Sequence, residues 1–296
     1  MNTRPALWYP LKVALGCLGY ASYFLSKVVF VVLVFPLFVV LLPFPRTQPM
    51  FVQFVTLRYL AFFSRVWLPL LGAYRVAEVS GLDQALAARP VVFVANHRSL
   101  MDAVLMIGLL PRTGVLIKSR DTRKVMNGLL ARYFDLVSID RHSLESIAAT
   151  LAKSRRLLDS GKNLLIFPEG TRARSGRLQH FHRVAFDLAL AAKVPVVPVI
   201  LHTPLPFMAK LPGSIFPRGR NDYRIRFLDP ELPRPGDDAK SLCDRIHGRM
   251  ARELKQLDTG TVWEQKPAAA AVATAPVNGP DPEPGCKTHH ESSTAV

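Results

Sequence analysis

The stretch VVFVANHRSLMD, residues 91–102, decides how the middle of the chain is organised. Its first five residues form an uninterrupted apolar run, which is typical of a buried strand. The residues that follow it, 103–110, read as the start of a helix. His97 and Asp102 therefore fall in a turn from strand to helix, where α/β proteins commonly place their sites.

His97 and Asp102 have the residue types and the spacing of a catalytic pair. The carboxylate can hold one ring nitrogen of the histidine, which leaves the other nitrogen free to take a proton. These are two of the three members of a Ser-His-Asp arrangement, and a substrate hydroxyl can take the place of the serine. An isolated match of this kind has a plainer alternative, in which His97 caps the helix and Asp102 is solvated.

A second stretch, FPEGTR at residues 167–172, changes the balance between these interpretations. It also follows an apolar run, residues 163–166, which predicts another buried strand. Successive βα units of a parallel sheet bring their carboxyl ends to one edge, so the two turns are expected to meet there. The second turn offers backbone amides and the guanidinium of Arg172, which suit a phosphate group. Gly170 lets the backbone approach such a ligand.

Together, NHRSLMD and FPEGTR resemble the paired motifs of the 1-acylglycerol-3-phosphate acyltransferases, which are glycerolipid acyltransferases of the H-x4-D type. The two motifs lie about seventy residues apart, and the resemblance covers roughly residues 75–230, about half of the chain. It implies transfer of an acyl chain from acyl-CoA or acyl-carrier protein to lysophosphatidic acid, which gives phosphatidic acid. The acyl donor is then a co-substrate, and neither a cofactor nor a metal is expected.

The resemblance also implies a role for each motif residue. His97 accepts the proton of the lipid hydroxyl, while Asp102 orients the imidazole ring and stabilises the imidazolium. Arg172 binds the phosphate of the acceptor. Glu169 either supports the site or contacts the glycerol.

Four further residues are candidates for substrate binding. Gly170 and Thr171 belong to the turn that faces the phosphate. Arg141 matches the arginine with which the family contacts its acceptor. Asn96 either anchors its turn or helps to polarise the carbonyl.

Two departures from the family pattern support a second hypothesis, in which the acceptor is a different lipid. The family commonly has Phe-x-x-Gly after the second motif, whereas residues 181–184 end in Val184. A valine adds bulk where a glycine allows close packing, so the acceptor or acyl pocket is expected to differ. The block from Lys118 to Gly128 also lacks the usual proline. The alternative function is therefore the same chemistry on a different lysolipid or on an amino-lipid.

Composition favours a membrane partner over nucleic acid. The chain has a net charge of +16, and the first 265 residues carry +17, because the remaining 31 have a net charge of −1. Such a charge suits anionic lipid surfaces or nucleic acid, but no familiar nucleic-acid motif is present. The three cysteines form neither a disulfide framework nor a metal spacing, which fits a reducing, cytoplasmic setting. A non-catalytic membrane-binding protein is the alternative outside enzymes, and the intact motifs argue against it.

The N-terminal segment is expected to anchor the chain to the membrane. Residues 28–45 are 18 consecutive residues without a charge, near the lower limit of ~17–25 for a spanning helix. One spanning helix and a two-helix hairpin that dips into one leaflet both fit this pattern. Residues 50–73 suggest either an interfacial helix or a helix packed on the catalytic domain. The supply of acyl donors favours an active site on the cytoplasmic side of the membrane.

The fold class predicted for the remainder is α/β, with a largely parallel sheet flanked by helices. We expect a membrane-anchoring helical region over 1–73, an acyltransferase domain over 74–260 and a disordered tail over 261–296, because the tail is rich in Ala, Pro, Thr and Ser. Strands are predicted at 74–79, 90–95, 114–118, 135–140, 163–167, 195–201 and 223–228. Helices are predicted at about 100–110, 123–133, 143–160, 181–192 and 239–257.

Overall fold

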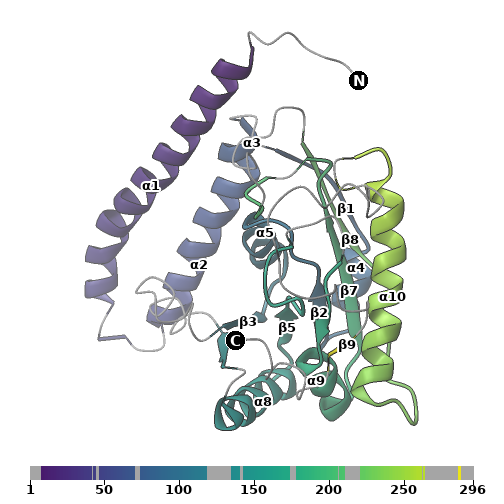
Figure 1. Ribbon diagram of the computed structural model, residues 1–296. Helices are drawn as coiled ribbons and strands as arrows, with labels where there is room; N and C mark the ends of the chain where they lie inside the picture. Colours follow the sequence, from purple (N-terminus) through teal and green to yellow (C-terminus); the bar gives the residue numbers. More distant parts are fainter. Residues whose placement is uncertain are drawn as a thin grey trace.

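A seven-stranded sheet forms the centre of the computed structural model, within the residues that the structure describes (Figure 1). These residues are 8–41, 43–44, 47–70, 74–118, 135–140, 143–173, 178–205, 207–210, 221–261, 263 and 286–287. The strands of the sheet are β1 (Arg75–Ser80), β2 (Val92–Ala95), β3 (Thr113–Lys118), β4 (Leu136–Ile139), β5 (Asn163–Ile166), β7 (Val196–His202) and β8 (Asp222–Phe227).

The strand order is β1-β8-β7-β2-β5-β3-β4, and neighbouring strands are parallel except for the antiparallel pair β7 and β8. The largely parallel α/β sheet is therefore confirmed. β2 and β5 are direct neighbours, with Val94 paired to Ile166. Their carboxyl ends lie side by side, so the turns that begin at Asn96 and Phe167 leave the same edge of the sheet.

Helices cover both faces of the sheet. One face carries α8, α9 and α10, while α4 and α5 lie on the other (Figure 1). The side chains of β2 alternate between the two cores, with Val92 and Val94 in the first and Phe93 and Ala95 in the second. A strand buried on both faces must be apolar throughout, which explains the continuous run in the sequence. The helices are α4 (Leu82–Ala87), α5 (Met101–Leu109), α8 (Leu144–Asp159), α9 (Val184–Ala192) and α10 (Ala239–Asp258).

The two longest helices of this domain begin at side-chain caps. Ser143 accepts a hydrogen bond from the backbone N–H of Ser146 at the start of α8. Asp238 and Ser241 form a reciprocal capping box at the start of α10. Such caps satisfy backbone donors that the first helical turn leaves unpaired.

The N-terminal region is an antiparallel pair of helices, of which the second packs against α5. α1 (Trp8–Val40) is followed by α2 (Thr47–Phe62), which continues through the π-helical η1 (Phe63–Trp67) into α3 (Leu68–Leu70). Ser22 accepts from the indole N–H of Trp67, and Ser26 bonds to Tyr59, so α1 and the α2–η1 segment run in opposite directions.

The structure places α2 and η1 on α5, which is the packed arrangement considered for residues 50–73. Arg65 of η1 donates to the carbonyl of Gly108 at 2.9 Å and fastens this contact. Within the described residues, no helix has the combination of length and apolar character that crossing a membrane requires. The membrane-embedded state of the N-terminal segment stays a prediction.

Most predicted elements occur within a few residues of their expected bounds. The exceptions are the short helix α4 and the strand pair β6 (Phe181–His182) and β9 (Cys286–Lys287), which the sequence did not predict. The helix expected at 123–133 lies outside the described residues. So does the predicted tail, apart from 261, 263 and 286–287, and the domain bounds therefore stay predictions.

Candidate active site

His97 and Asp102 form a hydrogen-bonded pair at the carboxyl end of β2. The distance from Nδ1 of His97 to Oδ2 of Asp102 is 2.9 Å. The carboxylate is buried in the first turn of α5, where a negative charge is favoured by the helix dipole. The backbone N–H groups of Arg98 and Ser99 donate to the same oxygen, each at 2.7 Å. The structure therefore holds Asp102 in the turn instead of exposing it to solvent.

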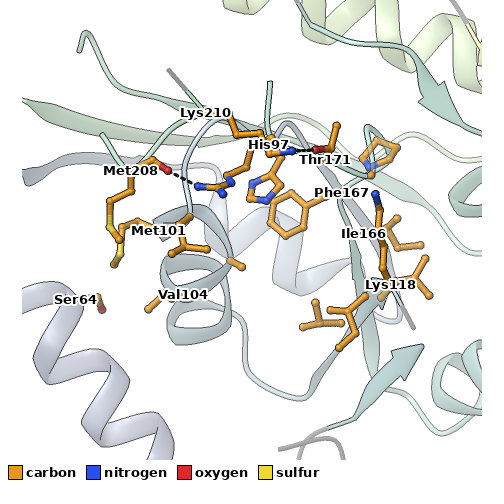
Figure 2. Close-up of a pocket in the computed structure, with 18 of the residues that line it drawn as sticks. Ser64, His97, Met101, Val104, Lys118, Ile166, Phe167, Thr171, Met208 and Lys210 are labelled. Atoms are coloured by element: carbon orange, nitrogen blue, oxygen red, sulfur yellow. Dashed lines mark hydrogen bonds between the residues drawn. The ribbon is translucent and has the colours of Figure 1, made fainter. Parts of the chain in front are cut away.

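The imidazole ring of His97 is partly accessible, with 18% of the side chain exposed. It packs on the ring of Phe167, with 4.6 Å between the ring centroids (Figure 2). Phe167 is the first residue after β5, so a residue of the second motif packs against the candidate catalytic histidine of the first motif.

Asn96 joins the end of β2 to β7. Its side-chain amide donates to the carbonyl of Leu201 at 2.9 Å, and its side-chain oxygen accepts from the N–H of Leu201 at 2.8 Å. The residue is fully buried. Both polar groups of its side chain thus bond to the backbone. Of the two alternatives for Asn96, anchoring the turn or polarising the carbonyl, this is the arrangement expected for anchoring.

Glu169 links the two motifs from a buried position. One carboxyl oxygen accepts from the backbone N–H of His97 at 2.8 Å, and the other accepts from that of Gln179 at 3.2 Å. Burial raises the pKa of Glu169 to about 8, against the opposing effect of these two N–H donors and of Arg98. The negative charge of Asp102 adds to the increase.

Gly170, Thr171 and Arg172 form the edge of the site next to His97. Gly170 has a φ of 63° and closes its turn by donating to the carbonyl of Phe167 at 3.0 Å. This left-handed conformation suits a glycine. Arg172 donates to the carbonyl of Met208 at 2.7 Å. Figure 2 shows Lys210 beside the hydroxyl of Thr171, to which its ammonium group donates.

These residues surround one end of a cavity of about 600 Å³. The end at His97 is polar and cationic, while the remainder is mainly apolar (Figure 2). The apolar lining comes from the N-terminal helices, from α5 and from β3. It includes Leu60, Phe63, Leu68, Met101, Val104, Val115, Leu116 and Ile117.

Behind the turn of the first motif, Arg98 and Asp258 form a buried ion pair. Two hydrogen bonds of 2.6 and 2.7 Å join the guanidinium to the carboxylate at the end of α10. The guanidinium also lies over the ring of Trp263, 4.7 Å from its centroid. Burial opposes ionisation of Asp258, but the hydrogen bonds from Arg98 and the nearby imidazole of His202, 3.3 Å away, hold the pKa of its carboxyl below the usual value.

Comparisons with known proteins agree with this geometry. The family model described as Acyltransferase matches residues 76–202, which span both motifs. The 1-acyl-sn-glycerol-3-phosphate acyltransferase alpha of Bos taurus is 30% identical over 205 residues, or 66% of this chain and 70% of the relative. The chain belongs to the 1-acyl-sn-glycerol-3-phosphate acyltransferase family.

Other relatives extend this acyltransferase assignment. The human 1-acyl-sn-glycerol-3-phosphate acyltransferase alpha is 30% identical over 187 residues, which cover 62% of this chain and 65% of the relative. The crystal structure of the 1-acyl-sn-glycerophosphate acyltransferase PlsC from Thermotoga maritima shares the fold. Its TM-score is 0.63 at 22% identity, over 83% of this chain and 95% of that chain.

The structure of this acyltransferase brings together seven of the eight predicted site residues. Arg141 is the exception, because it lies outside the described residues. Val184, the departure from the family pattern, is buried at the start of α9 and lines the cavity. Lys118 lines it from the end of β3. Within the part of the chain that the structure describes, no cluster of His, Cys, Asp or Glu side chains is placed to hold a metal ion.

Three residues with a role at this site were not predicted from the sequence. Phe167 supports the ring of His97, Lys210 adds a cation beside Thr171, and the hydroxyl of Tyr223 donates to Asp102. Tyr223 and Lys210 come from segments that follow the second motif by about forty residues or more. Alternation along 223–228 predicts a strand, but it does not show which motif the strand faces.

Proposed function

We propose that the enzyme transfers an acyl chain from a thioester donor, acyl-CoA or acyl-carrier protein, to the free hydroxyl of 1-acylglycerol-3-phosphate, which forms phosphatidic acid. The supporting observation is that His97, which bonds to Asp102, lines one cavity together with the turn that carries Arg172 and with a mainly apolar wall. The names of the relatives point to the same reaction.

His97 acts as the general base in this proposal. Asp102 holds Nδ1, so Nε2 accepts the proton of the acceptor hydroxyl as its oxygen attacks the thioester carbonyl. The carbon–sulfur bond then breaks, and the imidazolium returns its proton to the sulfur, so that the donor leaves as a thiol. Asp102 stabilises the imidazolium in between. Asn96 and Glu169 keep the turn in place through their bonds to the backbone.

The acceptor phosphate binds at Arg172 and the turn before it. A guanidinium matches two phosphate oxygens, and the hydroxyl of Thr171 adds a neutral donor. Arg172 exchanges the carbonyl of Met208 for the phosphate when the acceptor binds. Lys210 lies next to Thr171 and adds a second positive charge. By resemblance to the family, Arg141 also contacts the acceptor.

The enzyme works at a membrane surface, with its active site on the cytoplasmic side. α1 and α2 expose many large apolar side chains, among them Phe24, Leu33, Met50 and Phe54. So many exposed apolar side chains on two neighbouring helices are typical of a membrane or partner interface. The net charge of +16 adds attraction to anionic lipids. The substrates are lipids, so the anchored enzyme meets them in the bilayer.

An acyl-transfer assay tests this function. Full-length protein in detergent is supplied with acyl-CoA, or with acyl-carrier protein in parallel, and with lysophosphatidic acid or other lysolipids. We expect turnover with lysophosphatidic acid, and a loss of about 10²–10⁴-fold in kcat for His97→Ala. Arg172→Ala is expected to raise KM for the acceptor about tenfold or more. Arg155→Ala, an exposed arginine of α8, is the matched control.

Val184 favours one second candidate, the same reaction on a different lysolipid. Its side chain fills part of the cavity wall near the second motif. Turnover with another lysolipid and none with lysophosphatidic acid would establish this alternative. Full turnover by His97→Ala would contradict the mechanism with either acceptor.

A further inference from the structure

The two carboxylate oxygens of Asp102 have different partners. Oδ2 receives the bond from His97 and those from the backbone N–H groups of Arg98 and Ser99. Oδ1 receives the hydroxyl of Tyr223, which comes from β8. The carboxylate that orients His97 is thus itself held by a side chain from a distant part of the sequence.

Tyr223 is built into the core, where its hydroxyl donates to Asp102. Its side chain is 1% exposed, and its ring meets that of Tyr74 edge-on with 5.8 Å between centroids. Burial, followed by the charge of Asp102, raises the pKa of Tyr223 well above its ordinary value. The phenol is therefore protonated at neutral pH, and it donates to Asp102.

We propose that Tyr223 is a positioning residue, which acts on catalysis through Asp102. Its hydrogen bond fixes the rotation of the carboxylate, so that Oδ2 stays aimed at Nδ1 of His97. It also takes up part of the carboxylate charge, which reduces the stabilisation of the imidazolium. The inference rests on the proposed role of His97 as the base.

Other charged and titratable groups also lie around His97 and Asp102. They come from the two motif turns, from β3, from β6 and from the segment after β7, and they are Arg98, Lys118, Glu169, Arg172, His182 and Lys210. A change confined to the hydroxyl of Tyr223 leaves all of them in place. The difference between wild type and such a variant therefore reports the hydrogen bond to Asp102.

Tyr223→Phe is the decisive variant, because it keeps the ring and removes the donor. The acid limb of kcat/KM against pH reports the base of the free enzyme. We expect this limb to move up by about half to one pH unit, and kcat to fall about tenfold, with little change in KM for the acceptor. Tyr74→Phe is the matched control. It removes a buried hydroxyl from the neighbouring ring, but that hydroxyl donates to the carbonyl of Ser64, so its acid limb is expected to stay in place.

A direct titration separates this inference from the proposed function. The pKa of His97 is measured by NMR on histidine-labelled enzyme, with the signal assigned by its loss in His97→Gln. A higher pKa in Tyr223→Phe and an unchanged one in Tyr74→Phe would support the positioning role, even if no acceptor were turned over. Equal pKa values in all three proteins would overturn it, while activity that depends on His97 would leave the proposed function intact.

A second replacement covers the case in which Tyr223→Phe folds poorly. 3-Fluorotyrosine at position 223 keeps the hydroxyl and makes it a stronger donor. The pKa of His97 is then expected to fall below that of the wild type. An unchanged pKa of His97 in the fluorotyrosine protein would count against the inference as clearly as an unchanged pKa in Tyr223→Phe.

Discussion

At the scale of single residues, Glu169 shows how a buried carboxyl makes stability depend on pH. Its folded-state pKa is about 8, whereas the ordinary value is 4.5. Between these values the folded protein keeps a proton that the unfolded chain has lost. Its contribution to stability is therefore full below about pH 4.5 and is lost as the pH rises toward 8.

Glu169→Gln removes this titration while it keeps the shape of the side chain. Between pH 5 and 8 the wild type is expected to lose stability by on the order of 3–5 kcal/mol more than the variant. Thermal and denaturant unfolding in detergent, repeated across this range, measure the difference. Glu145→Gln on the exposed first turn of α8 is the control and should follow the wild type. Parallel curves for wild type and Glu169→Gln would refute the raised pKa.

The motif residues were predictable from sequence, whereas their supporting partners were not. A histidine and an aspartate five positions apart already suggest a pair, since the chain itself brings them close. Tyr223 reaches Asp102 only through the arrangement of strands, as it lies on the far side of β7 from β2. No local pattern around Tyr223 carries that information.

At the scale of elements, the ion pair between Asp258 and Arg98 holds the end of α10 in position. A carboxylate at a helix C-terminus is disfavoured by the helix dipole. Asp258 is nevertheless the last residue of α10, and both it and Arg98 are largely buried, at 8% and 4% side-chain exposure. The ion pair offsets the dipole and fastens α10 to the turn that carries His97.

Asp258→Asn should therefore destabilise the fold strongly. It leaves the guanidinium of Arg98 buried without a countercharge, which costs about 3–5 kcal/mol. Asp244→Asn is a matched change on the same helix, where Asp244 pairs with Lys240 in solvent, and its expected cost is about 0.5 kcal/mol or less. Denaturant unfolding of both variants gives the comparison. Similar losses in the two would mean that Asp258 stabilises only the helix surface.

Element prediction succeeded where the hydrophobic pattern was long or fully buried. The apolar runs of β2, β5 and β7 have side chains in both cores, and the amphipathic pattern of α10 matches its single buried face. The six residues of α4 are too few to establish a helical period. The two-residue strand β6 depends on pairing with Cys286 and Lys287, which are distant in sequence.

At the scale of the whole molecule, the N-terminal helices and the catalytic domain share one cavity. Leu60, Phe63 and Leu68 line it from the α2–η1–α3 segment, and His97 lines it at the edge of the sheet. The sequence placed the two regions in separate domains, since hydropathy along a chain does not show how its parts pack. The shared cavity gives a physical reason for a lipid acyltransferase to keep its helices beside its active site.

The exposed face of α1 leads to a prediction about membrane binding. Leu25, Val28, Val32 and Phe35 follow one helical stripe, and each is at least 60% exposed. Burying one such side chain in an apolar phase is worth about 1.5–3 kcal/mol. Replacing Val28, Val32 and Phe35 together by serine should thus weaken binding to anionic liposomes by at least about a hundredfold.

Liposome flotation measures this binding, and the choice of control decides what the result means. Leu144 and Leu232 are also strongly exposed, but they lie singly on the catalytic domain. The double variant Leu144→Ser/Leu232→Ser should therefore bind liposomes as the wild type does. If the triple variant of α1 also floated normally, the helix would not be the membrane contact, and basic residues would have to supply the attraction. If the triple variant lost flotation but kept turnover of lysolipid in detergent, the apolar stripe would serve only to bring the enzyme to its substrates.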